Sequence, residues 1–205
     1  MPQPLRAELL TIGTELLNGA TVNTNAAYLA RRLAETGIRC ARQVAVSDER
    51  ADLQQALAEG VTRANVLIIT GGLGPTCDDV TIAALAEVAH RPLRCDADVV
   101  ASIRRFYTRR RRALQQAALR QADLPEGGIA LSNPLGTAPG LCLPLTGWVV
   151  VALPGVPSEM RAIMERHVLP RLRRLAKPHV IESRTIRTAG LVELLARASS
   201  ISIRS

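Results

Sequence analysis

The sequence predicts an α/β fold, a three-layer α/β/α sandwich with a mostly parallel sheet, and three observations support this class. Short aliphatic runs alternate with stretches of helical periodicity from the N-terminus onward. One run, Val66–Thr70, is almost entirely apolar, as expected of a strand that is buried on both faces. Three of the runs lead directly into polar or glycine-rich loops that precede a helix. Such alternation implies right-handed crossovers between parallel strands.

The first half of the chain is expected to contain strands and helices in strict alternation. Asn23–Asn25 supplies residue types that cap helices, and the apolar stripe that follows stops at Gly37. Asp78 or Asp79 is expected to cap a later helix. In chain order, the expected elements are a strand over Ala7–Ile12, a helix from Asn25 toward Gly37, a strand over Cys40–Val46, a helix over Asp52–Thr62, a strand over Val66–Thr70 and a helix over Val80–His90.

The second half is less regular. Leu124–Gly128 is rich in residues that break helices, and Pro157 is well placed in the first turn of a helix, where it removes no hydrogen bond. Residues 1–175 are expected to form one domain, and residues 176–205 to begin a following segment. The expected elements are one or two helices over Asp96–Gln121, strands over Ile129–Leu131 and Trp148–Leu153 with a turn-rich stretch between them, and a helix over Ser158–His167.

Composition argues against several classes of protein. The 205 residues are 47% hydrophobic, without a run of about 18 apolar residues that could span a membrane, and the N-terminus lacks the layout of a signal peptide. The four cysteines and three histidines are scattered, which argues against a zinc cluster or a disulfide framework. We therefore expect a cytoplasmic protein with reduced thiols and no membrane contact.

The net charge of +8 is concentrated in the second half of the chain. Residues 104–205 carry 17 basic and 6 acidic side chains, against 9 and 12 in residues 1–103. Such a basic excess attracts phosphates of nucleic acids or of small nucleotides. Arg109–Arg112 is the strongest local signal for nucleic acid, and its alternative interpretation is a solvated helix face. Because aromatic residues make up only 2%, a base-stacking module is not indicated, and nucleic acid is not the expected partner.

Three loops at strand ends are the candidates for chemistry. They are Gly13–Glu15, Gly71–Asp79 and Leu153–Glu159. In an open parallel sheet, ligands bind beyond the carboxyl ends of the strands. If the three strands are neighbours, the three loops form one pocket.

The loop Gly71–Asp79 is the most informative of the three. Its glycines allow backbone N–H groups to approach an anion, and the helix that follows adds partial positive charge, which suits a phosphate. It matches neither the Walker loop nor the dinucleotide fingerprint. Asp78 and Asp79 are hard oxygen ligands that suit Mg²⁺ held jointly with substrate phosphates. The alternative is that one aspartate caps the helix and the glycines only form a turn.

Several of these stretches together resemble the competence/damage-inducible protein A (CinA) family. The matching stretches recur in order over about residues 7–175. The resemblance implies the molybdopterin-binding fold of molybdenum-cofactor biosynthesis proteins of the MoaB/MogA type. It also implies a metal-dependent ADP-ribose pyrophosphatase activity. The stretches are Gly13–Gly19, Asn23–Asn25, Thr70–Thr76, Asp78–Thr81, Asn133–Gly140 and Leu153–Met160.

The leading hypothesis is therefore a hydrolase that splits ADP-ribose into AMP and ribose 5-phosphate with a divalent metal ion such as Mg²⁺. Asp79 and Glu15 are the expected catalytic residues, and Asp78 and Asp79 the expected metal ligands. The alternatives are a molybdopterin-binding protein and a non-catalytic regulatory domain. The residues expected to bind substrate or phosphate are Gly13, Thr14, Asn25, Gly71, Gly72, Gly74, Thr76, Gly155 and Glu159.

The sequence departs from the family pattern in two places. It stops at Ser205, where many members continue into a nicotinamide-nucleotide deamidase domain, so this chain alone is not expected to deamidate. Relatives tend to carry Asn where Ala118 stands: if that amide contacts substrate, binding is weakened in this chain, and if it only caps a helix, little changes. Exposed apolar surface would favour self-association, and a homodimer is expected.

Overall fold

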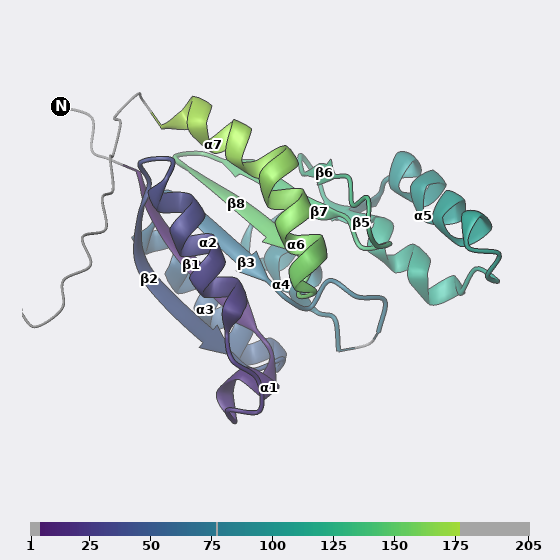
Figure 1. Cartoon of the computed structure of the whole chain (residues 1–205), viewed down its shortest axis with the longest axis horizontal. Helices are drawn as coiled ribbons and strands as arrows, with labels where there is room; N and C mark the ends of the chain where they lie inside the picture. Colours follow the sequence, from purple (N-terminus) through teal and green to yellow (C-terminus); the bar gives the residue numbers. More distant parts are fainter. Residues whose placement is uncertain (1–4, 77, 177–205) are drawn as a thin grey trace, which may run out of the picture.

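Six strands form the central sheet of the computed structural model, which describes residues 5–76 and 78–176 (Figure 1). Along the sheet the order is β2-β1-β3-β8-β7-β6. The first four of these run parallel, and β7 and β6 each run antiparallel to the preceding neighbour. The strands are β1 (Arg6–Ile12), β2 (Arg39–Val46), β3 (Val66–Thr70), β6 (Ile129–Leu131), β7 (Gly140–Leu145) and β8 (Trp148–Leu153).

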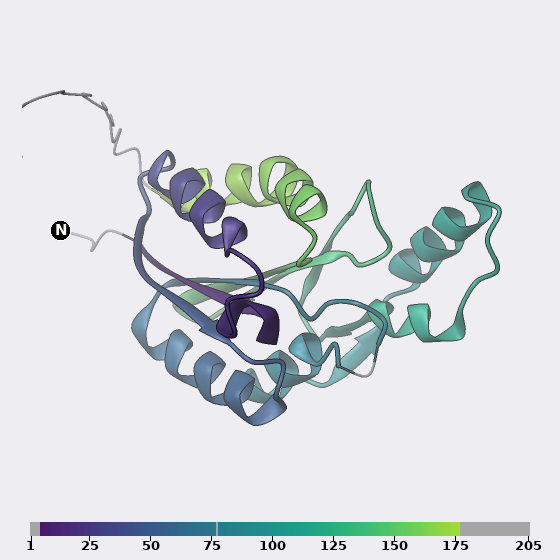
Figure 2. The same cartoon turned by 60° about the horizontal axis from the view of Figure 1, so that its bottom comes forward.

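Helices cover both faces of this sheet, which confirms the predicted α/β class with a mostly parallel sheet (Figure 2). Alternate residues of β3 enter two separate cores: Leu67 and Ile69 pack on one side, Val66 and Ile68 on the other. The first core is covered by α3 (Arg50–Arg63) and α4 (Thr81–Val88). The second is covered by α2 (Thr24–Ala34), α6 (Pro157–Ile163), the π-helical turn η2 (Met164–Val168) and α7 (Leu169–Leu175).

Residues 97–122 leave the sheet and form a projecting arm, seen at the right of Figure 1. The arm consists of α5 (Ala97–Arg109) and a 3₁₀ helix, η1 (Gln116–Ala122). A two-stranded antiparallel ribbon of β4 (Leu93–Cys95) and β5 (Asp123–Pro125) joins its base. The sequence predicted the helices here but not the ribbon.

The arginine run is exposed, as the solvated interpretation expects, but only Arg109 belongs to α5, so the run does not form a helix face. The helix α5 ends at Arg109, and Arg111 adopts a left-handed conformation with φ of 51°. Only glycine adopts this conformation without steric cost, so the chain is held in a tight turn here. Arg110 and Arg112 line a pocket that is described below, whereas Arg111 does not.

The ends of the helices show which predicted caps form. Asn23 accepts a hydrogen bond from the Ala26 amide at 3.0 Å and caps α2, as predicted. The helix α4 instead has Val80 at its N-cap position, without a side-chain cap. The prediction that Asp78 or Asp79 caps this helix is wrong, because Asp79 turns back toward the preceding loop.

A short helix, α1 (Thr14–Leu17), follows β1 directly. Within residues 5–76 and 78–176, no helix has the length and apolar character needed to cross a membrane. The segment expected to follow the domain lies, from residue 177 onward, outside the described residues.

Candidate functional site

The three predicted loops lie side by side, because β1, β3 and β8 are adjacent parallel strands. The Asn25 side chain crosses between them: it donates to the Gly155 carbonyl at 2.8 Å and to the Thr70 hydroxyl at 3.3 Å. The Thr70 hydroxyl in turn donates to the Pro154 carbonyl at 2.9 Å. The carboxyl end of the sheet is thus closed by a polar network, as expected of a ligand site in an open α/β sheet.

The start of the β3 loop requires glycine. Gly71 and Gly72 have φ of 114° and 63°. A Cβ on Gly71 would lie 2.4 Å from the Ile12 carbonyl oxygen, and one on Gly72 would lie 2.2 Å from the Thr81 hydroxyl. That hydroxyl donates to the Gly71 carbonyl at 3.0 Å, which fixes the loop to the start of α4.

Asp79 occupies the centre of this loop. Its carboxylate accepts the Gly74 amide at 2.7 Å, the Thr76 amide at 2.9 Å and the Thr76 hydroxyl. Gly74 is required here too, because a Cβ would lie 2.3 Å from a carboxylate oxygen of Asp79. The loop therefore holds the carboxylate of its own Asp79, and phosphate binding by its glycines stays a prediction. Among the described residues, the amides of Gly72 and Leu73 donate to no partner.

Next to this loop lies the main pocket, with a volume of about 540 Å³, within the range of small-molecule sites. Asp79 and Glu159 contribute carboxylates to it, and Arg110 and Arg112 contribute guanidinium groups from the arm. The other lining residues are Gly72, Leu73, Gly74, Pro75, Phe106, Tyr107, Gln121, Leu135, Gly136, Thr137, Ala138, Pro154, Gly155 and Val156.

Glu159 is positioned by a residue to which the sequence analysis assigned no role. The Asn133 amide donates to the Glu159 carboxylate at 2.6 Å and to the Ala138 carbonyl at 2.8 Å. The Asn133 oxygen accepts the amides of Leu135 and Gly136, both at 3.0 Å. The sequence showed Asn133 as part of a turn-rich stretch that matches the family, but not its contact with Glu159, which lies 26 residues away.

Glu15 and Asn25 line a second, smaller pocket of about 140 Å³. Gly155 lines both pockets and separates them. Thr14 is exposed and donates its amide to Asp48 at 3.0 Å, and Gly13 is buried beside Glu15. Gly72, Gly74, Asp79 and Glu159 thus line the main pocket and Glu15 and Asn25 the smaller one, whereas Gly13, Thr14, Gly71, Thr76 and Asp78 line neither.

A buried amide joins the arm to the β3 loop. Gln121 is only 8% exposed, and its side-chain nitrogen donates to the Leu73 carbonyl at 3.2 Å. Its oxygen has no hydrogen-bond partner among the described residues. Since a carbonyl can only accept, the nitrogen must face Leu73, and the orientation of the amide is determined. The sequence showed Gln121 only at the end of a predicted helix.

A divalent metal would have to be shared with a ligand. In the part of the chain that the structure describes, no three His, Cys, Asp or Glu side chains form a metal-binding group. Asp79 and Glu159 are the carboxylates of the main pocket, and Asp78 is exposed. This donor set fits Mg²⁺ only in the manner of sites completed by substrate phosphates and water. The assignment of Asp78 and Asp79 as metal ligands stays a prediction.

Comparison with known proteins agrees with this geometry. A family model described as "Probable molybdopterin binding domain" matches residues 8–174. A crystal structure of the protein CinA, of unknown function, from Thermoplasma acidophilum is 36% identical, with a TM-score of 0.74. It covers 79% of this chain and 95% of that chain. The chain belongs to the CinA-like family. The resemblance inferred from its motifs is thereby confirmed.

Two further matches define how far this likeness extends. A CinA-like protein from Salinibacter ruber is 44% identical over 190 residues, which is 92% of this chain and 46% of that protein. This CinA-like chain thus spans less than half the length of that relative. The molybdopterin biosynthesis enzyme MoaB from Thermus thermophilus is 18% identical, with a TM-score of 0.54, over 83% of this chain and 97% of that chain. That likeness shows the shared fold alone.

Proposed function

We propose that this CinA-like domain binds a phosphorylated pterin of the molybdopterin type in the main pocket. The observation that carries the proposal is the glycine loop after β3, which already holds an anionic group on its amides and opens into a pocket of about 540 Å³. The family model that matches residues 8–174 is described as "Probable molybdopterin binding domain", which supports the same class of ligand.

The phosphate of such a ligand would lie against the β3 loop. The amides of Gly72 and Leu73 offer donors there, and backbone amides before a helix are suited to phosphate. Arg112 lines the same pocket from the arm and supplies a charged donor for phosphate oxygens. The Asp79 carboxylate already accepts the neighbouring amides of Gly74 and Thr76, and its negative charge repels a phosphate. A cation bound with the ligand would offset this repulsion.

Calorimetric titration with molybdopterin, AMP and ADP-ribose tests the proposal. Arg112→Ala is expected to weaken molybdopterin binding by about tenfold, because it removes a charged hydrogen bond to phosphate. Arg109→Ala is the matched control, since Arg109 is exposed on the same arm and does not line the main pocket. A folded protein that does not bind molybdopterin would contradict the proposal.

A hydrolase is the second candidate, and it rests on one observation: Asp79 and Glu159 place two carboxylates on the same pocket. A divalent cation bound with ADP-ribose would neutralise its pyrophosphate. In the reaction, the oxygen of water bonds to one phosphorus as the bridging P–O bond breaks. The departing phosphate takes the proton, and AMP and ribose 5-phosphate are the products.

The hydrolase hypothesis is tested by incubating the protein with ADP-ribose, with and without Mg²⁺, and by measuring the AMP that forms. Asp79→Ala is expected to abolish metal-dependent AMP formation. Glu15→Gln examines the smaller pocket separately: loss of AMP formation at unchanged ADP-ribose affinity would assign water activation to Glu15. Absence of AMP under all conditions, with intact ligand binding, would leave the binding function alone.

A further inference from the structure

The wall of the main pocket opposite the β3 loop is aromatic and basic. The chain has only four aromatic residues, one Phe, two Tyr and one Trp, and Phe106 and Tyr107 both line this pocket. The Arg110 guanidinium lies over the Phe106 ring, with its central carbon 4.4 Å from the ring centroid. The two rings meet edge to face, with centroids 6.2 Å apart and planes at 73°. Aromatic side chains are thus concentrated at one cavity in a chain that otherwise nearly lacks them.

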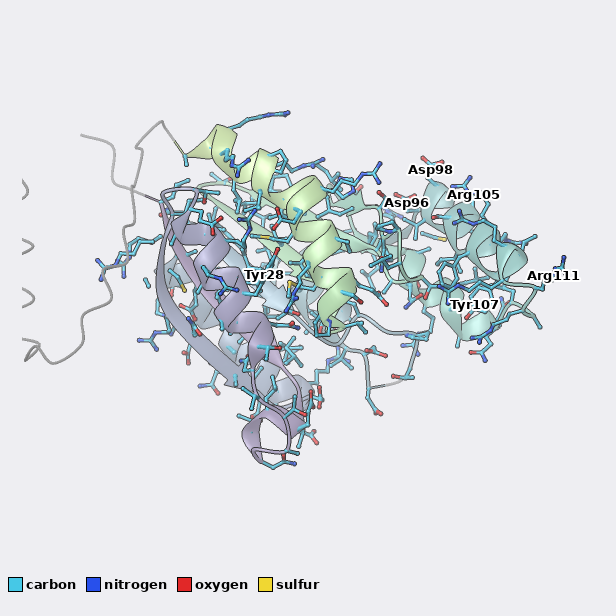
Figure 3. All side chains as sticks on the ribbon, in the orientation of Figure 1. Tyr28, Asp96, Asp98, Arg105, Tyr107 and Arg111 are labelled. Atoms are coloured by element: carbon cyan, nitrogen blue, oxygen red, sulfur yellow. The ribbon has the colours of Figure 1, made fainter. Side chains whose placement is uncertain are left out.

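The periodicity of α5 explains how these side chains reach the pocket. Val99 and Ile103 lie one helical turn apart and are buried in the core. Tyr107 continues the same face by one more turn and packs against that core while it lines the pocket. Figure 3 shows Tyr107 on the side of α5 that faces η1, whereas Asp98 and Arg105 lie on the opposite side.

The arm is also fastened at its base. Asp96 accepts the amides of Asp98 and Val99 at 2.9 and 3.0 Å and caps α5. Gln121, near the end of η1 and so also at the base of the arm, donates to the Leu73 carbonyl at 3.2 Å. The base of the arm is therefore joined to the β3 loop by a hydrogen bond, and Tyr107 joins α5 to the core by packing.

We propose that Phe106, Tyr107 and Arg110 bind the flat heteroaromatic ring of the ligand whose phosphate lies at the β3 loop. This inference rests on the proposed function and specifies its ligand class: a ring-bearing phosphate, either a pterin or a nucleotide. A guanidinium stacked on an aromatic ring forms a planar surface that matches a planar ring. A phosphate bound by Arg110 is the competing explanation, and the comparison with ribose 5-phosphate separates it from ring stacking.

The experiment compares phosphorylated ligands that carry a flat ring with one that does not. AMP and ribose 5-phosphate both carry a phosphorylated ribose, but only AMP carries a base; molybdopterin tests the pterin ring. We expect wild-type protein to bind at least one ring-bearing compound about tenfold more tightly than ribose 5-phosphate. The member of the pair AMP and molybdopterin that binds more tightly identifies the source of the ring.

Two variants examine the wall itself. Phe106→Leu removes the aromatic face, and Arg110→Lys keeps the charge but loses the planar group. Each is expected to weaken the preferred ring-bearing compound by about tenfold and to change ribose 5-phosphate affinity by less than about twofold. Arg109→Lys is the control, because Arg109 ends the same helix but does not line the main pocket.

The outcomes separate the two proposals. If ribose 5-phosphate binds and the ring-bearing compounds bind no more tightly, the ring inference is overturned and phosphate binding stands. Equal weakening of all three compounds by Arg110→Lys would also overturn it, because the wall would then act through phosphate. If none of the three compounds binds the folded wild-type protein, the proposed function fails and the inference fails with it.

Discussion

Asp79 is the residue for which the structure makes the sharpest prediction. Its carboxylate accepts two backbone amides and one hydroxyl, and so joins Gly74 and Thr76 across the β3 loop. Asp79→Ala removes all three acceptors at once. The amides then face a pocket that water can enter, because Thr76 is exposed and Gly74 is partly exposed.

The magnitude follows from the number and exposure of these bonds. A hydrogen bond to a charged group contributes about 1.5–3 kcal/mol when buried. Because the loop is partly hydrated and the three bonds share one carboxylate, we expect a total loss of about 2–3 kcal/mol. A domain of ordinary stability, about 5–15 kcal/mol, stays folded after such a loss.

Urea denaturation measures this loss, with the fluorescence of the sole tryptophan, Trp148, as the signal. Asp48→Ala is the matched control, since half-buried Asp48 accepts a single backbone amide, that of Thr14 at 3.0 Å. A loss for Asp79→Ala no larger than that for Asp48→Ala would refute the reasoning, because three bonds would then contribute no more than one.

The same variant also changes anion binding. Without the aspartate, the Gly74 and Thr76 amides become available, and the loop loses a negative charge that repels phosphate. We expect Asp79→Ala to bind ribose 5-phosphate more tightly than wild type when no metal is present. Weaker binding of ribose 5-phosphate by a folded variant would show that these amides do not meet the ligand.

Three further predictions concern ionisable groups outside the site. Arg63→Ala should destabilise the fold by about 3 kcal/mol in urea denaturation, because Glu8, 3% exposed, would lose its ion pair at 2.8 Å; a loss near zero would contradict this. Burial, followed by the hydrogen bond to Glu165, raises the pKa of Tyr28 to about 12, so stability should fall as the pH rises from 10 toward 12. Tyrosinate absorbance measures this titration, and Glu165→Gln should lower its midpoint. Burial, followed by two neighbouring arginines, lowers the pKa of His167 below 6.5, so its contribution to stability is lost as the pH falls through that lowered value. An NMR titration midpoint at or above 6.5 would contradict it.

The hydrophobic pattern of the sequence predicted the buried parallel strands best. The strand β3 was predicted with its observed bounds, because a run such as Val66–Thr70 is compatible with little else. The strand β7 was missed: Pro144 lies within it and lacks the amide that a central strand would use, which argues against a strand on sequence alone. The ribbon of β4 and β5 was missed because each strand has three residues and depends on its partner.

The candidate site shows the same division. Glycines and strand ends predicted where the three loops meet, since these are local features. The conformation of the loop decides whether an aspartate caps the next helix or turns back to the loop. The sequence does not show this conformation, so the prediction that Asp79 is a cap was wrong. The separation of Glu15 from Asp79 into two pockets depends on how Gly155 packs between them, which no spacing along the chain reveals.

The structure shows which members of the arginine run contribute to a pocket, which the sequence alone did not indicate. As a continuous helix face, four consecutive arginines would only be a solvated or nucleic-acid-attracting surface. The left-handed conformation of Arg111 divides them: Arg110 and Arg112 line the main pocket, whereas Arg111 lies at the outer end of the arm (Figure 3). The pocket therefore has one carboxylate on the β3 loop, a second on α6 and its guanidinium groups on the arm. The proposed ligand places its ring on the arm and its phosphate at the β3 loop, where a bound cation would offset the two carboxylates. In that proposal, the basic second half of the chain and the glycine loop of the first half meet at one pocket.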